Sequence, residues 1–171
     1  MTISTRPATV CYAAAMGKAH VLSWQYAYKG MINQTTLDDL KITDRVSMWD
    51  KVLTNKKANN LQIVLLNNDE VIGFAVGTPT HADMFFLHAM YIHPDHTGNG
   101  YGDKLLNAFK QECLNRSFKK MECGVLTANK NARKFYEKNG GVWQPSLAED
   151  WKCFDGNEYP EGTYHFDLTK D

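Results

Sequence analysis

The sequence has no excess of charge of either sign. Its 171 residues include 19 Lys and Arg and 19 Asp and Glu, which gives a formal net charge of zero. Proteins that bind nucleic-acid phosphates or anionic membranes carry a basic excess, so we expect neither as a partner.

Long apolar runs and targeting patterns are also absent. No run approaches the roughly 18 consecutive apolar residues of a membrane-spanning helix. Residues 1–9 lack the charged-then-apolar order of a signal peptide. With 43% hydrophobic and 22% charged residues, the composition is that of an ordinary globular protein. We therefore expect one soluble, cytoplasmic domain over residues 1–171.

Residues that bind metals are few, and their spacing is unfavourable. The four cysteines match no zinc or redox pair, and of the six histidines only His93 and His96 lie close together. No cluster of carboxylates and cysteines completes a coordination shell around that pair. We expect reduced cysteines and no metal site.

Hydrophobic periodicity predicts a mixed α/β or α+β sheet with an antiparallel meander in its first half. Strand patterns occur at residues 3–6, 61–66, 70–77, 84–92, 121–126, 142–147 and 163–168. Helical patterns occur at 9–28, with Thr9 as its N-cap, at 37–53, with a restart at Thr43 or Asp44, at about 102–114 and at 129–139. The strand at 84–92 is long and apolar, so we expect it in the centre of the sheet.

A glycine-rich loop follows that central strand and opens a helix. It reads Thr97, Gly98, Asn99, Gly100, Tyr101, Gly102. Alternate glycines let several N–H groups point into one concavity at the positive end of the helix dipole, where a pyrophosphate binds well.

Three kinds of phosphate site compete for this loop. A Walker loop needs Lys and a hydroxyl directly after its last glycine, but Gly102 is followed by Asp103 and Lys104. A dinucleotide fingerprint has its third glycine one residue later and follows a first strand. The third kind is the pyrophosphate loop of coenzyme A-dependent acyltransferases. A plain turn that needs glycine only for its geometry is the remaining alternative.

Two segments together resemble the GNAT superfamily of acetyl-CoA-dependent N-acetyltransferases. Residues 87–109 (LHAMYIHPDHTGNGYGDKLLNAF) are similar to the coenzyme-binding motif, and residues 128–140 (ANKNARKFYEKNG) to the second motif, in the family's order and separation. Residues 23–32 also resemble the N-terminal helix of small-molecule members. The resemblance implies a splayed central sheet of six to seven strands, flanked by about four helices.

The resemblance also implies where acetyl-CoA would bind, namely between the strands at 84–92 and 121–126. The open edge of the first strand would satisfy the pantetheine amides. The implied cofactor-binding residues are Met90, Tyr91 and Ile92 for the pantetheine arm, Thr97, Gly98, Asn99, Gly100, Tyr101 and Gly102 for the pyrophosphate, and Asn129 and Tyr136. One position departs from the family pattern, because Thr97 stands where Gln or Arg is usual.

Two residues are candidates for catalysis. Tyr136 matches the family's general acid, and a phenol with a pKa near 10 can reprotonate the departing thiolate. Its alternative role is aromatic packing. Many relatives carry a Glu near the position of Phe86, so the candidate base here is His88, on the same strand face. A packed histidine and a water chain without a single base are the alternatives.

Trp24 and Tyr28 are four residues apart and share a helix face. The resemblance implies that this face borders the acceptor pocket, where the rings would flank an apolar stem or a cationic amine. Core packing is the alternative for Trp24. Tyr159, Glu161 and Tyr164 are further candidates for the border of this pocket.

These residues predict an acetyl-CoA-dependent enzyme in which a primary amine of a small molecule or peptide attacks the thioester directly in a ternary complex. Many relatives form dimers, so a homodimer is compatible with this reading. The alternative function is an acyl-CoA-binding or sensing module without turnover. Thr97 and the absence of a carboxylate at Phe86 favour that alternative.

Overall fold

The computed structural model describes residues 2–55, 57–145 and 150–170. The strands are β1 (Ile3–Pro7), β2 (Leu61–Asn67), β3 (Glu70–His81), β4 (Met84–Ile92), β5 (Lys120–Leu126), β6 (Val142–Gln144), β7 (Asp150–Lys152) and β8 (Glu158–Asp167). The helices are α1 (Ala13–Ala27), α2 (Gln34–Asp38), α3 (Ile42–Thr54), α4 (Tyr101–Asn115) and α5 (Lys130–Lys138). Short 3₁₀ turns, Val10–Tyr12 and Pro94–His96, precede α1 and the glycine-rich loop.

The strands form one open mixed sheet in the order β1-β2-β3-β4-β5-β8-β6, with β7 paired to β8. Every pairing is antiparallel except that of β4 with β5. The mixed fold and the central place of β4 are confirmed. Within the described residues the sheet has eight strands rather than six to seven, because the three-residue β7 is too short to give a periodic signal.

Several predicted boundaries were wrong. The helix expected from Thr9 starts with a 3₁₀ turn, and the Thr9 side chain caps nothing because its Oγ1 contacts Cys11 Sγ at 2.9 Å. The region expected from residue 37 begins earlier, at Gln34, and the restart expected at Thr43 or Asp44 is confirmed to within a residue, since the second helix begins at Ile42. Strand β8 begins at Glu158, earlier than predicted. The strand predicted at 142–147 is confirmed for Val142–Gln144, whereas residues 146 and 147 lie outside the described residues.

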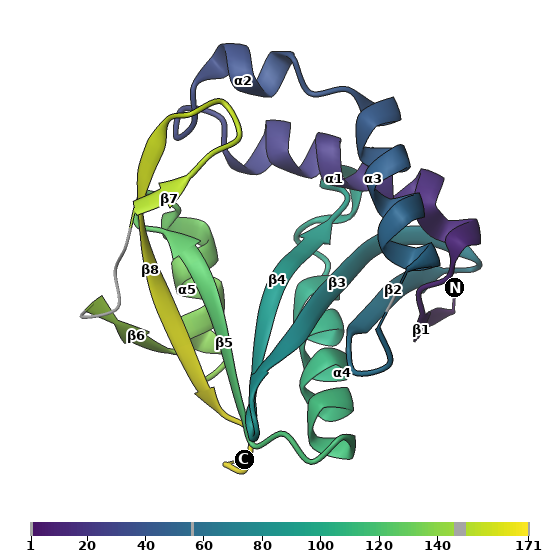
Figure 1. The fold of residues 1–171 in the computed structure, drawn as a ribbon, viewed down its shortest axis with the longest axis vertical. Coiled ribbons are helices and arrows are strands. Elements are labelled where there is room, and N and C mark those ends of the chain that lie inside the picture. Colours follow the sequence, from purple (N-terminus) through teal and green to yellow (C-terminus); the bar gives the residue numbers. More distant parts are fainter. Residues whose placement is uncertain (1, 56, 146–149, 171) are drawn as a thin grey trace.

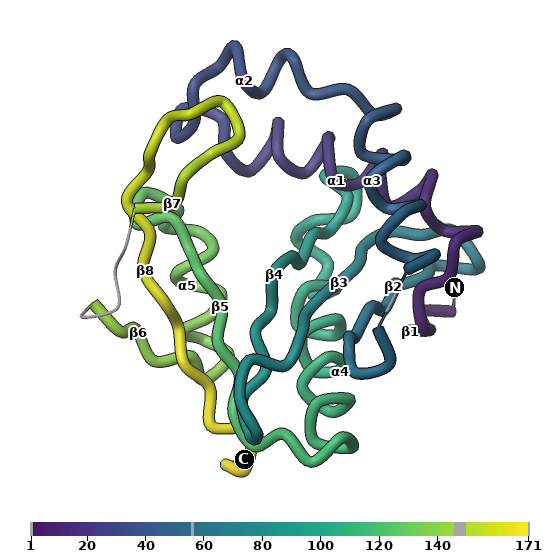
Figure 2. The backbone as a smooth tube through the Cα atoms, viewed as in Figure 1, coloured from purple at the N-terminus to yellow at the C-terminus, as the bar shows by residue number. Residues whose placement is uncertain are grey.

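Helices cover both faces of the sheet. On one face α4 buries Leu105, Leu106 and Phe109 against Phe85 of β4, and α5 packs beside them with partly buried Tyr136. On the other face α1 and α3 bury a second set, which includes Met16, Trp49 and Phe74. The helix α1 then runs on across the space between β4 and β5 (Figure 1). The tube in Figure 2 follows the same path.

The sheet splays open between β4 and β5. These two strands pair only from Met84 to Phe86 and from Lys120 to Glu122. Beyond those residues they diverge, and Figure 1 shows the gap widening away from the C-terminus. We call the region between residues 87–92 and 123–126 the fork. The expectation of a splayed sheet is therefore confirmed.

A β-bulge lies where the fork begins. In the pairing of β3 with β4, Gly77 faces Leu87 and Val76 faces Ala89, so His88 is an extra residue on β4. A bulge shifts the alternation of side chains and occurs often beside active sites. Its effect is that Met90 and Ile92 join Leu87 on the face of α4, while Tyr91 turns to the face of α1 and α3.

Candidate active site

The two faces of the fork carry different chemistry. The face toward α4 and α5 has Met90 from β4 and Cys123 and Val125 from β5. On the opposite face, Tyr91 and Leu126 pack with Trp24 and Tyr28 of α1. A ligand that passes through the fork would therefore have different side chains on its two sides.

The larger of two cavities at the fork has a volume of about 440 Å³. Met90 and Tyr91 line it from one strand and Gly124, Val125 and Leu126 from the other, so both open edges reach it. The remaining lining comes from the end of α1 and from α5: Tyr26, Ala27, Tyr28, Lys29, Met31, Asn129, Asn131, Ala132 and Tyr136. The structure thus brings together Met90, Tyr91, Asn129, Tyr136 and Tyr28 from the sequence-derived set.

Asn129 and Tyr136 are held by α5. Asn129 is 8% exposed, and its Oδ1 accepts a hydrogen bond from Ala132 N at 3.0 Å, so it caps the N-terminus of α5. Tyr136 lies about two turns further along the helix, with its ring 5.2 Å from that of Phe135 and 5.8 Å from that of Tyr164. Burial holds the pKa of Tyr136 well above its usual value of 10.0. The phenol therefore stays protonated.

The glycine-rich loop stands between β4 and α4 and lines neither cavity at the fork. Gly98 and Gly100 have φ values of +78° and +73°, which side chains other than glycine rarely adopt. A Cβ on either would meet no atom within 4 Å, so the loop is open on that side. Within the described residues, the N–H groups of Gly98, Asn99 and Gly100 donate no hydrogen bond.

Two side chains of this loop donate hydrogen bonds to backbone carbonyls in or just before it. The Thr97 hydroxyl donates to Pro94 O at 2.9 Å, and the Thr97 N–H donates to the same oxygen at 3.2 Å. Asn99 Nδ2 donates to His96 O and Thr97 O. Both Thr97 donors are therefore engaged, and the backbone donors without a partner among the described residues are those of Gly98, Asn99 and Gly100.

A smaller cavity of about 140 Å³ adjoins the fork on the α1 face. It is lined by Trp24, Tyr28, His88, Tyr91, Gly124, Leu126, Trp151 and Glu161. Trp24 and Tyr28 are thus brought together with His88 in this cavity. Trp24 is also a core residue, 7% exposed, and its Nε1 donates to Tyr91 Oη at 2.8 Å. Trp24 therefore both packs in the core and lines the cavity.

His88, the bulged residue, is exposed to solvent, and its ring is tilted by 52° to that of Phe86, with ring centroids 4.9 Å apart. Its Nε2 lies 2.7 Å from Thr78 Oγ1, so Nδ1 is the nitrogen left for another partner. Desolvation by the surrounding strands lowers the pKa of His88 from its usual value of 6.5. The imidazole is therefore neutral near pH 7.

Sequence reasoning missed Trp151, because its strand β7 gave no signal. Of the three C-terminal candidates, Glu161 lines the smaller cavity. Tyr159 packs behind that cavity, with its ring 6.1 Å from Trp151 and its Oη accepting from Asn33 N. Tyr164 was wrongly suggested, since it is fully buried between α5 and β6 and its Oη donates to Glu137 Oε1 at 2.7 Å.

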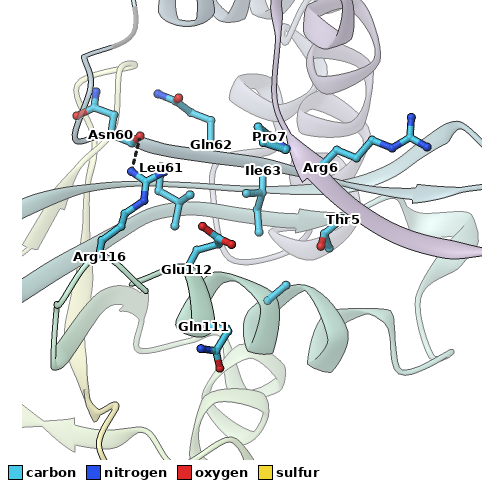
Figure 3. Close-up of a pocket in the computed structure, with 11 residues that line it drawn as sticks. Thr5, Arg6, Pro7, Asn60, Leu61, Gln62, Ile63, Gln111, Glu112 and Arg116 are labelled. Carbon is cyan, nitrogen blue, oxygen red and sulfur yellow. Dashed lines mark hydrogen bonds between the residues drawn. The ribbon is translucent and has the colours of Figure 1, made fainter. Parts of the chain in front are cut away.

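A further cavity, of about 330 Å³, lies outside the fork between β1, β2 and α4. Leu61 and Ile63 point from the sheet toward α4, and Glu112 points back at them (Figure 3). Arg116 closes one end by donating to Asn60 O at 3.2 Å. This cavity contains none of the residues that the sequence predicted to be functional.

Two features are absent from the described residues. No group of three or more His, Cys, Asp or Glu side chains there is arranged to hold a metal ion. No helix in that part of the chain has both the length and the apolar character needed to cross a membrane.

Comparison with solved structures finds the same fold. The PaiA N-acetyltransferase of Thermoplasma acidophilum, solved with coenzyme A, is 17% identical with a TM-score of 0.74, over 98% of this chain and 99% of that one. The acetyltransferase YncA of Salmonella typhimurium, solved with acetyl-CoA, is 18% identical with a TM-score of 0.72, over 100% of this chain and 96% of that one.

Sequence comparison reaches the family. A bovine (Bos taurus) thialysine N-epsilon-acetyltransferase is 30% identical over 69 residues, which is 40% of each chain. The match therefore spans less than half the length of that relative. The model of the Acetyltransferase (GNAT) family matches residues 23–141, more than half of the chain. The chain therefore belongs to the GNAT acetyltransferase family.

Proposed function

We propose that the protein binds acetyl-CoA in the fork and transfers the acetyl group to a primary amine. The observation that carries this proposal is the fork itself, in which β4 and β5 have no strand between them beyond Phe86 and Glu122. A pantetheine arm contains amides that need partners when buried, and an open strand edge provides them. Met90 lies on this edge of β4 and lines the cavity of about 440 Å³, which gives the arm room, and the Ile92 carbonyl on the same edge also accepts from Ser23 Oγ at 3.0 Å.

The glycine-rich loop would hold the pyrophosphate. The N–H groups of Gly98, Asn99 and Gly100 donate to no other described residue, and α4 begins directly after them. Free donors at a helix N-terminus suit a pyrophosphate. Because Thr97 is already engaged with Pro94, backbone donors rather than a side chain would provide the affinity.

The reaction needs three changes at the acetyl group. An ammonium must lose a proton so that its lone pair can attack the thioester carbon. The C–N bond then forms, and the C–S bond breaks with its electron pair on sulfur. The amide nitrogen keeps one of the three original protons, the thiolate receives one, and one is released to solvent.

Tyr136 is the proposed acid for the thiolate. It lines the larger cavity, and its raised pKa keeps the proton available at neutral pH. No covalent acetyl-enzyme is proposed, because burial raises the pKa of the Cys123 thiol and keeps it protonated.

His88 is the proposed base, acting directly or through water. It lines the smaller cavity. Because its pKa is lowered, the neutral imidazole, which can accept a proton, predominates at neutral pH. The two groups thus lie on opposite faces of the fork, acid on the α5 side and base on the α1 side. A relative named for acetylating the N-epsilon of thialysine supports an amine as the acceptor.

An acetyl-transfer assay with a panel of primary amines tests the proposal. The wild type should transfer acetyl, and Tyr136→Phe should lower kcat about 100-fold or more, the usual contribution of a general acid. Tyr12→Phe, which removes a hydroxyl on the 3₁₀ turn Val10–Tyr12 outside the fork, should leave kcat unchanged. Coenzyme A binding without transfer to any amine would instead favour the binding-module alternative.

A further inference from the structure

Glu161 places a carboxylate in the fork. It is half-buried on β8, opposite Leu126 of β5. A Cβ built on Gly124 would lie 2.6 Å from Glu161 Oε1 and 2.7 Å from its carboxyl carbon. The carboxylate therefore occupies the space that a side chain at position 124 would fill, and it lines the smaller cavity from the side opposite β4.

This carboxylate has no partner within the described residues. No hydrogen bond or ion pair of the Glu161 side chain occurs there, whereas Glu122, further along β5, has its Oε1 2.8 Å from His165 Nε2. A partly buried carboxylate without a partner is unfavourable unless a ligand neutralises it. The carboxylate of Glu122 thus has a contact partner in the protein, whereas that of Glu161 has none among the described residues.

The other walls of this cavity are mainly aromatic. Trp24 has its ring edge-to-face with Tyr28 at 5.2 Å and with Trp151 at 5.8 Å. Tyr91 completes the lining on the β4 side. Aromatic faces attract cations, and they also pack against methylene groups. A carboxylate at the base of such walls is a site for an ammonium ion on an aliphatic stem.

We propose that Glu161 binds the ammonium group of the acceptor and so makes the enzyme selective for unbranched primary amines that are cationic in solution. This inference rests on the proposed function. A cavity of about 140 Å³ has room for only about four or five water-sized groups. It therefore admits an ammonium and a short stem, and the rest of the acceptor lies outside.

The pH dependence of binding follows from the charge of Glu161. Desolvation raises the pKa of this carboxyl from its usual value of 4.5. It is charged above that raised pKa and neutral below it, so affinity for an ammonium falls as the pH falls through it. The titratable groups that face Glu161 include Tyr28 after α1, His88 and Tyr91 of β4, and Cys123 of β5.

Calorimetric titration of butylamine into protein saturated with coenzyme A tests the binding role without any chemistry. Glu161→Gln keeps the side-chain shape but removes the charge, so it should weaken butylamine binding by about 10- to 100-fold, the range of a charge-assisted hydrogen bond. The matched control is Glu158→Gln, an exposed glutamate on the same strand, which should bind like the wild type. Aniline, an amine that is uncharged at neutral pH, should lose little affinity in Glu161→Gln.

A second variant tests position rather than charge. Gly124→Ala places a methyl group where the Glu161 carboxylate lies and should displace it. In acetyl-transfer assays both variants should raise KM for butylamine more than they lower kcat. The affinity for butylamine should fall at low pH in His88→Gln, as in the wild type, and this fall should be absent in Glu161→Gln.

The outcomes separate this inference from the proposed function. Equal butylamine affinity in Glu161→Gln and the wild type, or no binding to the wild type, overturns the role of Glu161 even if acetyl transfer is observed. Coenzyme A binding without acetyl transfer overturns the enzymatic proposal, while the butylamine titration still reports on Glu161.

Discussion

His20 shows how a single buried side chain supports the fork. Its ring stacks on Tyr91 at 5.1 Å, and its Nδ1 accepts from Trp49 Nε1 at 3.2 Å. Burial, and to a lesser extent the charge of Arg45, lower the pKa of His20 from 6.5 to about 3. The native protein therefore holds this imidazole neutral, against the ring of Tyr91, which lines the smaller cavity.

This pKa predicts a loss of stability in mild acid. The unfolded chain takes up a proton at His20 near pH 6.5, but the native state does so only near pH 3. The contribution is therefore complete above the unfolded pKa and is lost as the pH falls below it. The free energy of unfolding should drop by about 2 kcal/mol from this group between about pH 7.5 and pH 5.

Urea unfolding at the two pH values measures this effect. The variant His20→Asn removes the titrating group, so its stability should change less over the same interval than that of the wild type. An equal change in both proteins would contradict the buried, neutral state of His20.

At the residue scale, the sequence could predict the site residues that belong to one short motif. Asn129 and Tyr136 fall within one thirteen-residue motif, residues 128–140, and the structure brings both to the larger cavity. The sequence offered Glu161 only as a candidate for the border of the acceptor pocket, because its position depends on the register of β8 against β5. No local pattern encodes that register.

The glycine-rich loop is the element whose geometry matters most for the proposed cofactor. Its two glycines at positive φ leave an open concavity beside the N-terminus of α4. Because the same geometry could serve a plain turn, the loop needs a test that separates backbone strain from ligand contact.

Gly100→Ala provides that test. Alanine at φ +73° should lower stability by about 1 kcal/mol, and its methyl group would enter the open side of the loop. We expect coenzyme A affinity to fall about tenfold or more by calorimetry. Gly140→Ala is the matched control, with φ +84° and equally open surroundings after α5. It should lose similar stability and no affinity; equal affinities in the two variants would argue against a pyrophosphate at the loop.

At the element scale, long periodic segments were predicted well and local irregularities were not. The strand at 84–92 has a continuous apolar pattern, and β4 has those bounds. The bulge at His88 leaves no trace in that pattern, yet it decides which face Tyr91 and Met90 adopt. The three-residue β7 was missed because it has too few residues for an alternating pattern.

Across the whole molecule, the fork depends on segments distant in sequence. The β7–β8 hairpin closes it on one side, where Asp155 accepts from Thr36 of α2 and Tyr159 accepts from Asn33 N. Helix α1 spans its open end (Figure 1). The splay followed from the family resemblance, but these closing contacts join residues more than 100 positions apart and required the structure.

A crystal structure of the protein soaked with coenzyme A tests the central claim most directly. The pyrophosphate should accept hydrogen bonds from the amides of Gly98 to Gly102, and the pantetheine arm should pair with β4 at Met90 and Ile92 inside the fork. Coenzyme A bound elsewhere, or a fork that stays empty at saturating concentration, would contradict the account.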